Sequence, residues 1–161
     1  MKYRLLLPVV LACATALAGC GPSPTQSLAF KAPDGWTSTP SMFGFQIWLK
    51  DPKGGSKESV FLLKVTEKPG TDKKIAMTSS LSDLNYKGAK VKSVSEITIC
   101  GDQKAQYLES TGTSKTGDTS EIEVVTTAYG DQRYVAVYAR PTTSSADAQA
   151  ETAIHSICQK K

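Results

Sequence analysis

The alternation of apolar and polar residues constrains the fold of this 161-residue chain more than any other feature of its sequence. From residue 28 onward the apolar residues recur mostly with period two, and glycine, proline and aspartate interrupt the pattern at short intervals. This alternation is typical of β-strands, whose successive side chains point to opposite faces of a sheet. The pattern predicts strands at 28–31, 44–50, 58–67, 91–99, 104–111, 120–129 and 133–140.

Two of these predicted strands are apolar on both faces. The run 60–63 is apolar throughout, so it predicts a central strand. Glycine precedes aspartate at 101–102 and again at 130–131, and glycine in the first of two linking positions suits a type II′ hairpin. The strand at 133–140 should be covered on both sides, because Tyr134, Ala136 and Tyr138 share one face and Val135, Val137 and Ala139 the other.

Two segments, 71–85 and 144–158, carry the longer apolar period of an amphipathic helix. Ser144, three residues before Asp147, resembles a capping box at the start of the second segment. Hairpin-linked strands with well-separated helices predict an α+β fold, an antiparallel sheet of about six to seven strands covered by two helices. The chain length fits a single domain of this kind over residues 28–161.

The first nineteen residues have the organisation of a secretory leader. A positively charged start precedes the apolar run 5–17, which is too short to span a bilayer as a helix. The sequence Leu17-Ala18-Gly19-Cys20 follows at once and resembles the lipobox of bacterial lipoproteins. The resemblance implies a signal peptide over 1–19, acyl chains such as palmitate on Cys20, and a lipidated tether over 20–27. The alternative is an ordinary signal peptide with an unmodified Cys20.

Lipidation of Cys20 would hold the mature protein at a membrane of the bacterial cell envelope, since two or three acyl chains anchor stably where one is marginal. Gly21, rather than aspartate, after the lipidated cysteine implies by the same resemblance export to the periplasmic face of the outer membrane in a Gram-negative host. Loss of Lys2 and Arg4 with the leader lowers the formal charge from +4 to +2. A net charge this close to zero gives no electrostatic basis for a nucleic-acid partner.

The four cysteines divide by position. Cys13 leaves with the leader and Cys20 carries lipid, so Cys100 and Cys158 remain in the domain. Outside the cytoplasm such a pair predicts a disulfide, with a reactive thiol as the alternative. Closing a loop of this length would stabilise the fold by about 4 kcal/mol on the chain-entropy account.

Two short segments resemble the ends of PsbP-like domains. The segment 30–36, Phe-Lys-Ala-Pro-Asp-Gly-Trp, is similar to the opening motif of that family. Tyr138-Ala139-Arg140, with a helix that ends Ile154-His155-Ser156-Ile157, is similar to its closing strand and helix. The resemblance covers nearly all of 28–158 and implies an antiparallel sheet between helices. It implies no reaction, because members of the family include photosystem accessory proteins and bacterial envelope lipoproteins.

Sequence motifs for catalysis are absent. The chain has no G-x-S-x-G, no glycine-rich phosphate loop and no H-E-x-x-H, which leaves no sequence indication of a metal or cofactor. Its single histidine, His155, flanks the apolar stripe of the second predicted helix and is interpreted as a surface residue. Glu121 and Glu123 share one strand face with Asp118 nearby, which is either a solvated face or an acidic site. The sequence therefore predicts a protein that is not an enzyme.

Aromatic residues gather between Trp36 and Trp48. In a strand, Phe43 and Phe45 lie on one face and Trp48 on the other, and core packing is the first interpretation. If Trp48 is exposed, its flanking Gln46 and Lys50 make it resemble an interface anchor. We therefore hypothesise a partner-binding segment that contains Trp48, Phe43 and Phe45.

The sequence is best explained by an envelope-anchored lipoprotein that serves as a noncatalytic binding or accessory module for a protein or small-molecule partner. Two alternatives stay open: a periplasmic immunity or inhibitor lipoprotein, and an envelope hydrolase with a nonstandard acidic site.

Overall fold

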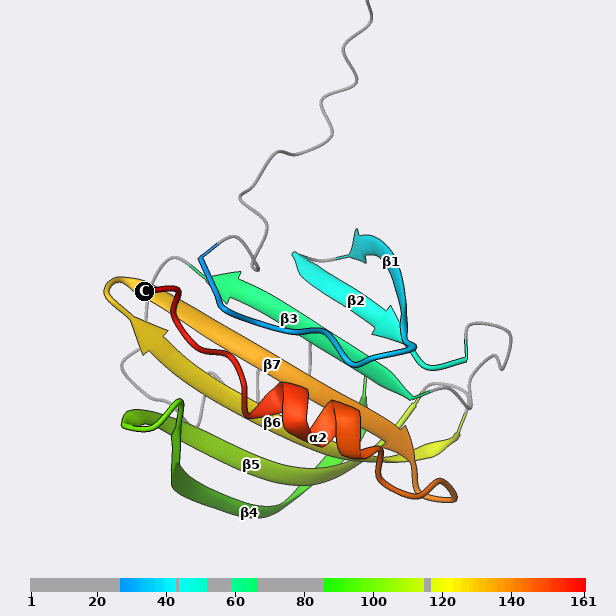
Figure 1. The fold of residues 1–161 in the computed structure, drawn as a ribbon. Helices are drawn as coiled ribbons and strands as arrows, with labels where there is room; N and C mark the ends of the chain where they lie inside the picture. Colours follow the sequence, from blue (N-terminus) through cyan, green and yellow to red (C-terminus); the bar gives the residue numbers. More distant parts are fainter. Residues whose placement is uncertain (1–26, 43, 52–58, 67–85, 115–116) are drawn as a thin grey trace, which may run out of the picture.

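One antiparallel sheet of seven strands makes up most of the described protein. The computed structural model describes residues 27–42, 44–51, 59–66, 86–114 and 117–161. The strand order across the sheet is β1-β2-β3-β7-β6-β5-β4, and every neighbouring pair is antiparallel (Figure 1). The strands are β1 (Thr37–Met42), β2 (Phe45–Leu49), β3 (Val60–Thr66), β4 (Lys87–Ile99), β5 (Gln103–Thr113), β6 (Thr119–Tyr129) and β7 (Gln132–Pro141).

The expected sheet covered by two helices is wrong, because the fold is sheet-rich and its described part contains a single short helix, α2 (Ala148–Ile154). Helix α2 is shorter than the predicted helix at 144–158, and it differs at both ends. Ser144 belongs to a turn, in which its amide donates to Pro141 O, so Asp147 caps the helix instead. After Ile154 the chain leaves the helix for the disulfide at Cys158. The predicted helix at 71–85 lies outside the described residues.

The strand predictions differ from the structure at three places. Residues 28–31 make only an isolated bridge, between Leu28 and Gln159, and form no strand. Strand β1 was not predicted because its sequence, TSTPSM, lacks apolar alternation, and its proline is tolerated because β1 is an edge strand. The turn after β4 has three residues, with Cys100 at a φ of 57°, whereas Gly130, at a φ of 60°, opens the predicted two-residue hairpin.

Two apolar clusters lie on opposite faces of the sheet, as the alternation along β7 predicts. The first face carries Tyr134, Ala136 and Tyr138 of β7, and α2 and residues 28–36 pack on it. Figure 1 shows α2 and this N-terminal segment in front of the sheet. The second face carries a further cluster of buried residues: Phe45, Leu62, Leu108, Ile122, Val124, Val135, Val137 and Ala139. The two strands predicted to be covered on both faces, β3 and β7, lie side by side within the sheet.

Asp147 fixes the start of α2 through three kinds of contact. Its Oδ1 accepts hydrogen bonds from the amides of Gln149 and Ala150, its Oδ2 lies 2.6 Å from Lys50 Nζ of the loop after β2, and its own amide donates to Tyr138 Oη. Burial alone would raise the pKa of Asp147, but the bonds from Lys50 and the two amides outweigh it and hold the pKa below its usual value. The carboxylate therefore stabilises the folded state.

We expect Asp147→Ala to lower the free energy of unfolding by about 1 kcal/mol at neutral pH, because a lost N-cap leaves helix amides unpaired. Since the folded pKa is depressed, the contribution of the carboxylate is present above the unfolded pKa and is lost as pH falls through the folded value. The stability difference from wild type should thus shrink in acid, as measured by urea unfolding at several pH values. Asp147→Asn is the control, since an amide oxygen still caps and should retain most of the stability.

Candidate functional site

An open groove runs beside α2 over the first face of the sheet, with a volume of about 860 Å³. We call it the helix groove. Its described lining comes from the strands β5, β6 and β7 on one side and from α2 with the residues after it on the other. The residues are Tyr107, Glu109, Glu123, Arg140, Ala148, Glu151, Thr152, His155, Ser156 and Cys158.

Strand register brings the charged side chains of the groove together. Glu109 of β5 and Glu123 of β6 are direct cross-strand partners, and Tyr107 shares the face of Glu109 two residues away. On α2, Glu151 and His155 are four residues apart and so lie on the same side of the helix. Tyr107, Glu123 and Arg140 are half-buried, whereas Glu109, Glu151, Thr152 and His155 are exposed.

Tyr107 is at the centre of the contacts in the groove. Its hydroxyl donates a hydrogen bond of 3.0 Å to Glu123 Oε2, and its ring centroid lies 5.8 Å from that of His155. Ser93 of β4 donates from its hydroxyl to Glu109 Oε2 over 2.6 Å. The carboxylates of Glu109 and Glu123 therefore accept hydrogen bonds from neutral hydroxyls.

Burial and neighbouring charge shift the acid–base properties of the groove. Burial, with the nearby carboxylates of Glu123 and Glu109, raises the pKa of Tyr107 far above its usual value, so the phenol stays protonated. Burial also raises the pKa of Glu123; the charges of Glu151 and Glu109 add to the rise, and the Tyr107 hydrogen bond and Arg140 oppose it. Although His155 is exposed, partial desolvation of the imidazole lowers its pKa, and the charge of Glu151 opposes the shift. The imidazole is thus neutral near pH 7.

Two hydroxyl side chains of the groove, those of Thr152 and Ser156, bond to the backbone of α2. Thr152 Oγ1 donates to Ala148 O, and Ser156 Oγ donates to Ala153 O, so both bonds go to helix backbone. Among the described hydrogen bonds none joins either hydroxyl to His155, and no three metal-binding side chains of the described ranges gather into a metal site.

The two glutamates predicted as a possible acidic site have different partners in the structure. Glu121 pairs with Lys92 of β4, whereas Glu123 accepts from Tyr107. Sequence reasoning missed Tyr107, Glu109, Arg140 and Glu151. Alternation in 104–111 indicates that Tyr107 and Glu109 share a face, but only the register with β6 brings them to Glu123.

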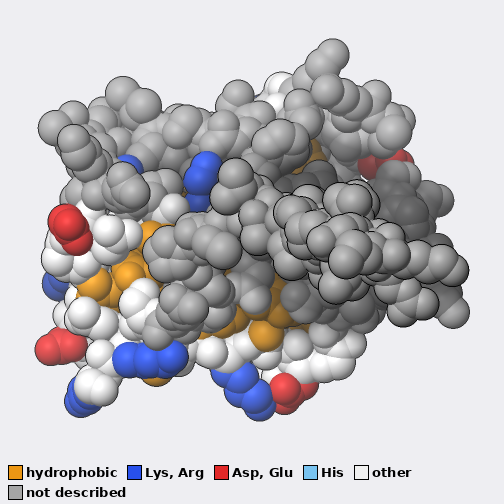
Figure 2. Space-filling view, turned by 90° about the horizontal axis from the view of Figure 1, so that it is seen from above, with side chains coloured by type: hydrophobic (Ala, Val, Ile, Leu, Met, Phe, Trp, Pro, Cys, Tyr) orange, Lys and Arg blue, Asp and Glu red, His pale blue; other side chains and the backbone are white. Residues whose placement is uncertain are grey.

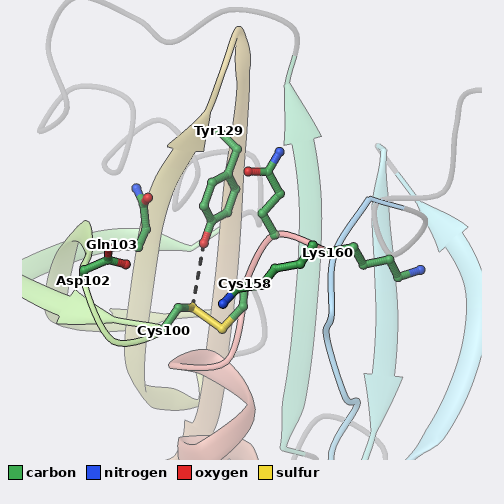
Figure 3. Close-up of a pocket in the computed structure, with 8 residues that line it drawn as sticks. Cys100, Asp102, Gln103, Tyr129, Cys158 and Lys160 are labelled. Atoms are coloured by element: carbon green, nitrogen blue, oxygen red, sulfur yellow. Dashed lines mark hydrogen bonds between the residues drawn. A yellow bond between two sulfur atoms is a disulfide. The ribbon is translucent and has the colours of Figure 1, made fainter.

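A second cavity, of about 360 Å³, lies at the disulfide between Cys100 and Cys158. The structure thus joins the two cysteines that the sequence leaves in the domain, with their Cα atoms 5.6 Å apart. Tyr129 points towards the disulfide in Figure 3; its Oη lies 3.7 Å from Cys100 Sγ and donates to Ile157 O over 3.0 Å. These contacts fasten the chain after α2 to the turn after β4, and we interpret this cavity as structural.

The predicted aromatic partner-binding segment does not form one surface. Trp48 is 5% exposed and packs in the first cluster, with ring centroids 5.4 Å from Phe30 and 5.8 Å from Phe61. Phe45, 1% exposed, belongs to the second cluster on the other face. Both side chains are enclosed by the core, and their role in binding a partner stays a prediction. Phe43 lies outside the described residues, as does Cys20.

Charged side chains of both signs lie on the face of the protein that Figure 2 shows. Seen there from the top of Figure 1, Lys and Arg side chains and Asp and Glu side chains surround some exposed apolar ones. In the part of the chain that the structure describes, no helix is long and apolar enough to cross a membrane.

Comparisons with known proteins show similarity of fold alone. No protein-family model matches the chain, so none supports the PsbP-like resemblance, and no curated protein matches it in sequence. A solved structure from Bacteroides thetaiotaomicron superposes with a TM-score of 0.55 at 17% identity, over 82% of this chain and 44% of the other. LpqN, described as involved in cell envelope biogenesis of Mycobacterium tuberculosis, superposes with a TM-score of 0.50 at 15% identity, over 80% of this chain and 79% of LpqN.

Proposed function

We propose that this protein is an envelope lipoprotein, anchored through lipid on Cys20, whose domain binds a protein or small-molecule partner without catalysing a reaction. The observation that best supports a binding function is the helix groove. Its volume of about 860 Å³ is in the range of ligand sites, and it combines aromatic, carboxylate and guanidinium groups on rigid elements.

Three observations support the envelope location. The lipobox ends at Cys20, seven residues before the described domain begins at Ser27, and the two prolines between them favour an extended tether. The disulfide is typical of proteins that fold outside the cytoplasm. LpqN, which shares the fold, is described as involved in cell envelope biogenesis. Because the residue after Cys20 is Gly21 rather than aspartate, we also propose that the protein is exported to the outer membrane in a Gram-negative host.

The contacts that His155 and the hydroxyls beside it make are compatible with the noncatalytic part of the proposal. The His155 ring lies beside that of Tyr107 at a tilt of 32°, and the nearby hydroxyls bond to helix backbone. Incubating the purified protein with envelope extract should capture a partner identifiable by mass spectrometry, with no turnover of envelope material. Turnover that is lost in His155→Ala would show the noncatalytic proposal to be wrong.

Cys20→Ala is expected to remove the lipid anchor while leaving the domain folded, because the tether separates Cys20 from the sheet. The wild type should fractionate with envelope membranes, and its intact mass should be that of a chain starting at acylated Cys20. The variant should lose both properties and keep the wild-type circular dichroism spectrum.

Cys13→Ala is the matched control, since it removes a cysteine of the leader that lies outside the lipobox. It should be processed and anchored like the wild type. An unmodified amino terminus at another residue in the wild type, or membrane retention of Cys20→Ala, would contradict lipid anchoring.

A further inference from the structure

We infer that the helix groove binds an organic cation, an ammonium or guanidinium group, held between its carboxylates and the Tyr107–His155 ring pair. The inference rests on the proposed binding function and specifies the chemistry of the ligand. Four features of the groove carry it: its charge, its aromatic wall, its volume and the placement of its one guanidinium.

Negative charge in the groove is not offset by local ion pairs. Glu109, Glu123 and Glu151 line the cavity, and none of them takes part in an ion pair of the described residues. Lys92, which lies on the adjacent strand β4, already pairs with Glu121. An anion entering the groove would therefore meet like charge, and a cation would meet opposite charge.

Arg140 supplies the single guanidinium of the described lining, and one of its nitrogens bonds to the fold. Its Nη1 donates to Ser144 O over 2.7 Å in the turn before α2, whereas its Nε is buried and has no hydrogen-bond partner among the described residues. The hydrogen bond from Nη1 holds the turn before α2, and the positive charge of Arg140 lowers the repulsion among the carboxylates of the groove. Three carboxylates against one guanidinium leave the groove net negative.

The aromatic wall selects an organic cation over a bare metal ion. Tyr107 and His155 lie with their ring planes tilted by 32°, and the face of a tyrosine ring attracts ammonium and guanidinium groups. Among the described residues no set of three side chains is placed to hold a metal. The cavity, at about 860 Å³, also has room for the chain that carries the cationic group.

An organic cation can come from a free amine or from a lysine or arginine side chain of a protein partner. Isothermal titration calorimetry of the mature lipidated protein in detergent distinguishes the two sources. The protein is titrated with spermidine and, separately, with a short lysine-rich peptide. Salt at about 0.15 M screens exposed charges beyond about 8 Å and suppresses nonspecific attraction. Binding of the peptide alone identifies a side chain, and binding of spermidine alone identifies a free amine.

Glu123→Gln should weaken binding of the active probe about tenfold, because a charge-assisted hydrogen bond is lost. The amide can still accept from Tyr107 Oη, so the fold should survive, as unfolding curves would verify. Glu151→Gln, on the exposed side of α2, is a second variant and should weaken binding in the same direction. Glu96→Gln is the matched control, because Glu96 pairs with Lys104 on the opposite face of the sheet. This variant should bind the active probe with an affinity within about twofold of that of the wild type.

Failure to bind either probe would overturn the inference, as would equal weakening by Glu96→Gln and Glu123→Gln. Such results leave the proposed function standing if the lipidated protein still captures a partner from envelope extract. The proposed function fails separately, if the wild type captures no partner or is not anchored.

Discussion

Replacing Cys100 and Cys158 together by serine is expected to lower the free energy of unfolding by about 4 kcal/mol. The disulfide joins residues 58 apart in sequence, and removing it restores conformational freedom to the unfolded chain. The double substitution avoids leaving a reactive free thiol. Urea unfolding of the purified protein measures the loss, and the wild type under reducing conditions should unfold at the same urea concentration as the variant.

The same variant should loosen one part of the molecule before the rest. The disulfide holds the segment in which Cys158 O accepts from Ala29 N and Lys160 N donates to Ser27 O. Amides at the start of the domain and after α2 should therefore lose protection from hydrogen exchange first, while those of β7 keep it. A double variant as stable as the wild type, with unchanged exchange, would contradict a stabilising role for the disulfide.

Alternation in the sequence was sufficient to predict the middle of the sheet. Strand β7 was predicted because both of its faces are apolar, and the structure places it between β3 and β6 with a cluster on each side. Strand β1 carries no such signal, since its Thr37–Met42 sequence is polar and contains proline. It forms because the backbone of β2 offers it a partner, which is a tertiary effect that local pattern does not contain.

Helix boundaries and the groove were less predictable for a related reason. Periodicity over 144–158 identified the apolar side of α2 but not its start, which depends on the contacts of Asp147 with Lys50 in the loop after β2 and with Tyr138 of β7. The groove likewise depends on register, since a shift of one residue between β5 and β6 would turn Glu123 away from Glu109. Its acids were visible in the sequence as separate residues and became a site only through pairing.

Trp48→Ala is expected to cost about 3–5 kcal/mol of unfolding free energy, the range for removing a buried aromatic side chain. Trp48 is 5% exposed and contacts the rings of Phe30 and Phe61, so its removal leaves a cavity beneath the N-terminal segment. The loss should appear as a lower urea midpoint with an unchanged slope. Phe30 packs over this cavity, and the amides around it should exchange faster than in the wild type.

Val94→Ala is the matched control for Trp48→Ala, because Val94 is an apolar strand residue that is 39% exposed, and its truncation should change stability by less than about 1 kcal/mol. Partner capture separates the two interpretations of Trp48. A core residue affects capture only as far as the domain unfolds, so at temperatures where Trp48→Ala remains folded the variant should capture as much partner as the wild type. A stability loss below about 1 kcal/mol, together with a capture loss of about 2 kcal/mol or more, would instead identify Trp48 as an interface hot spot.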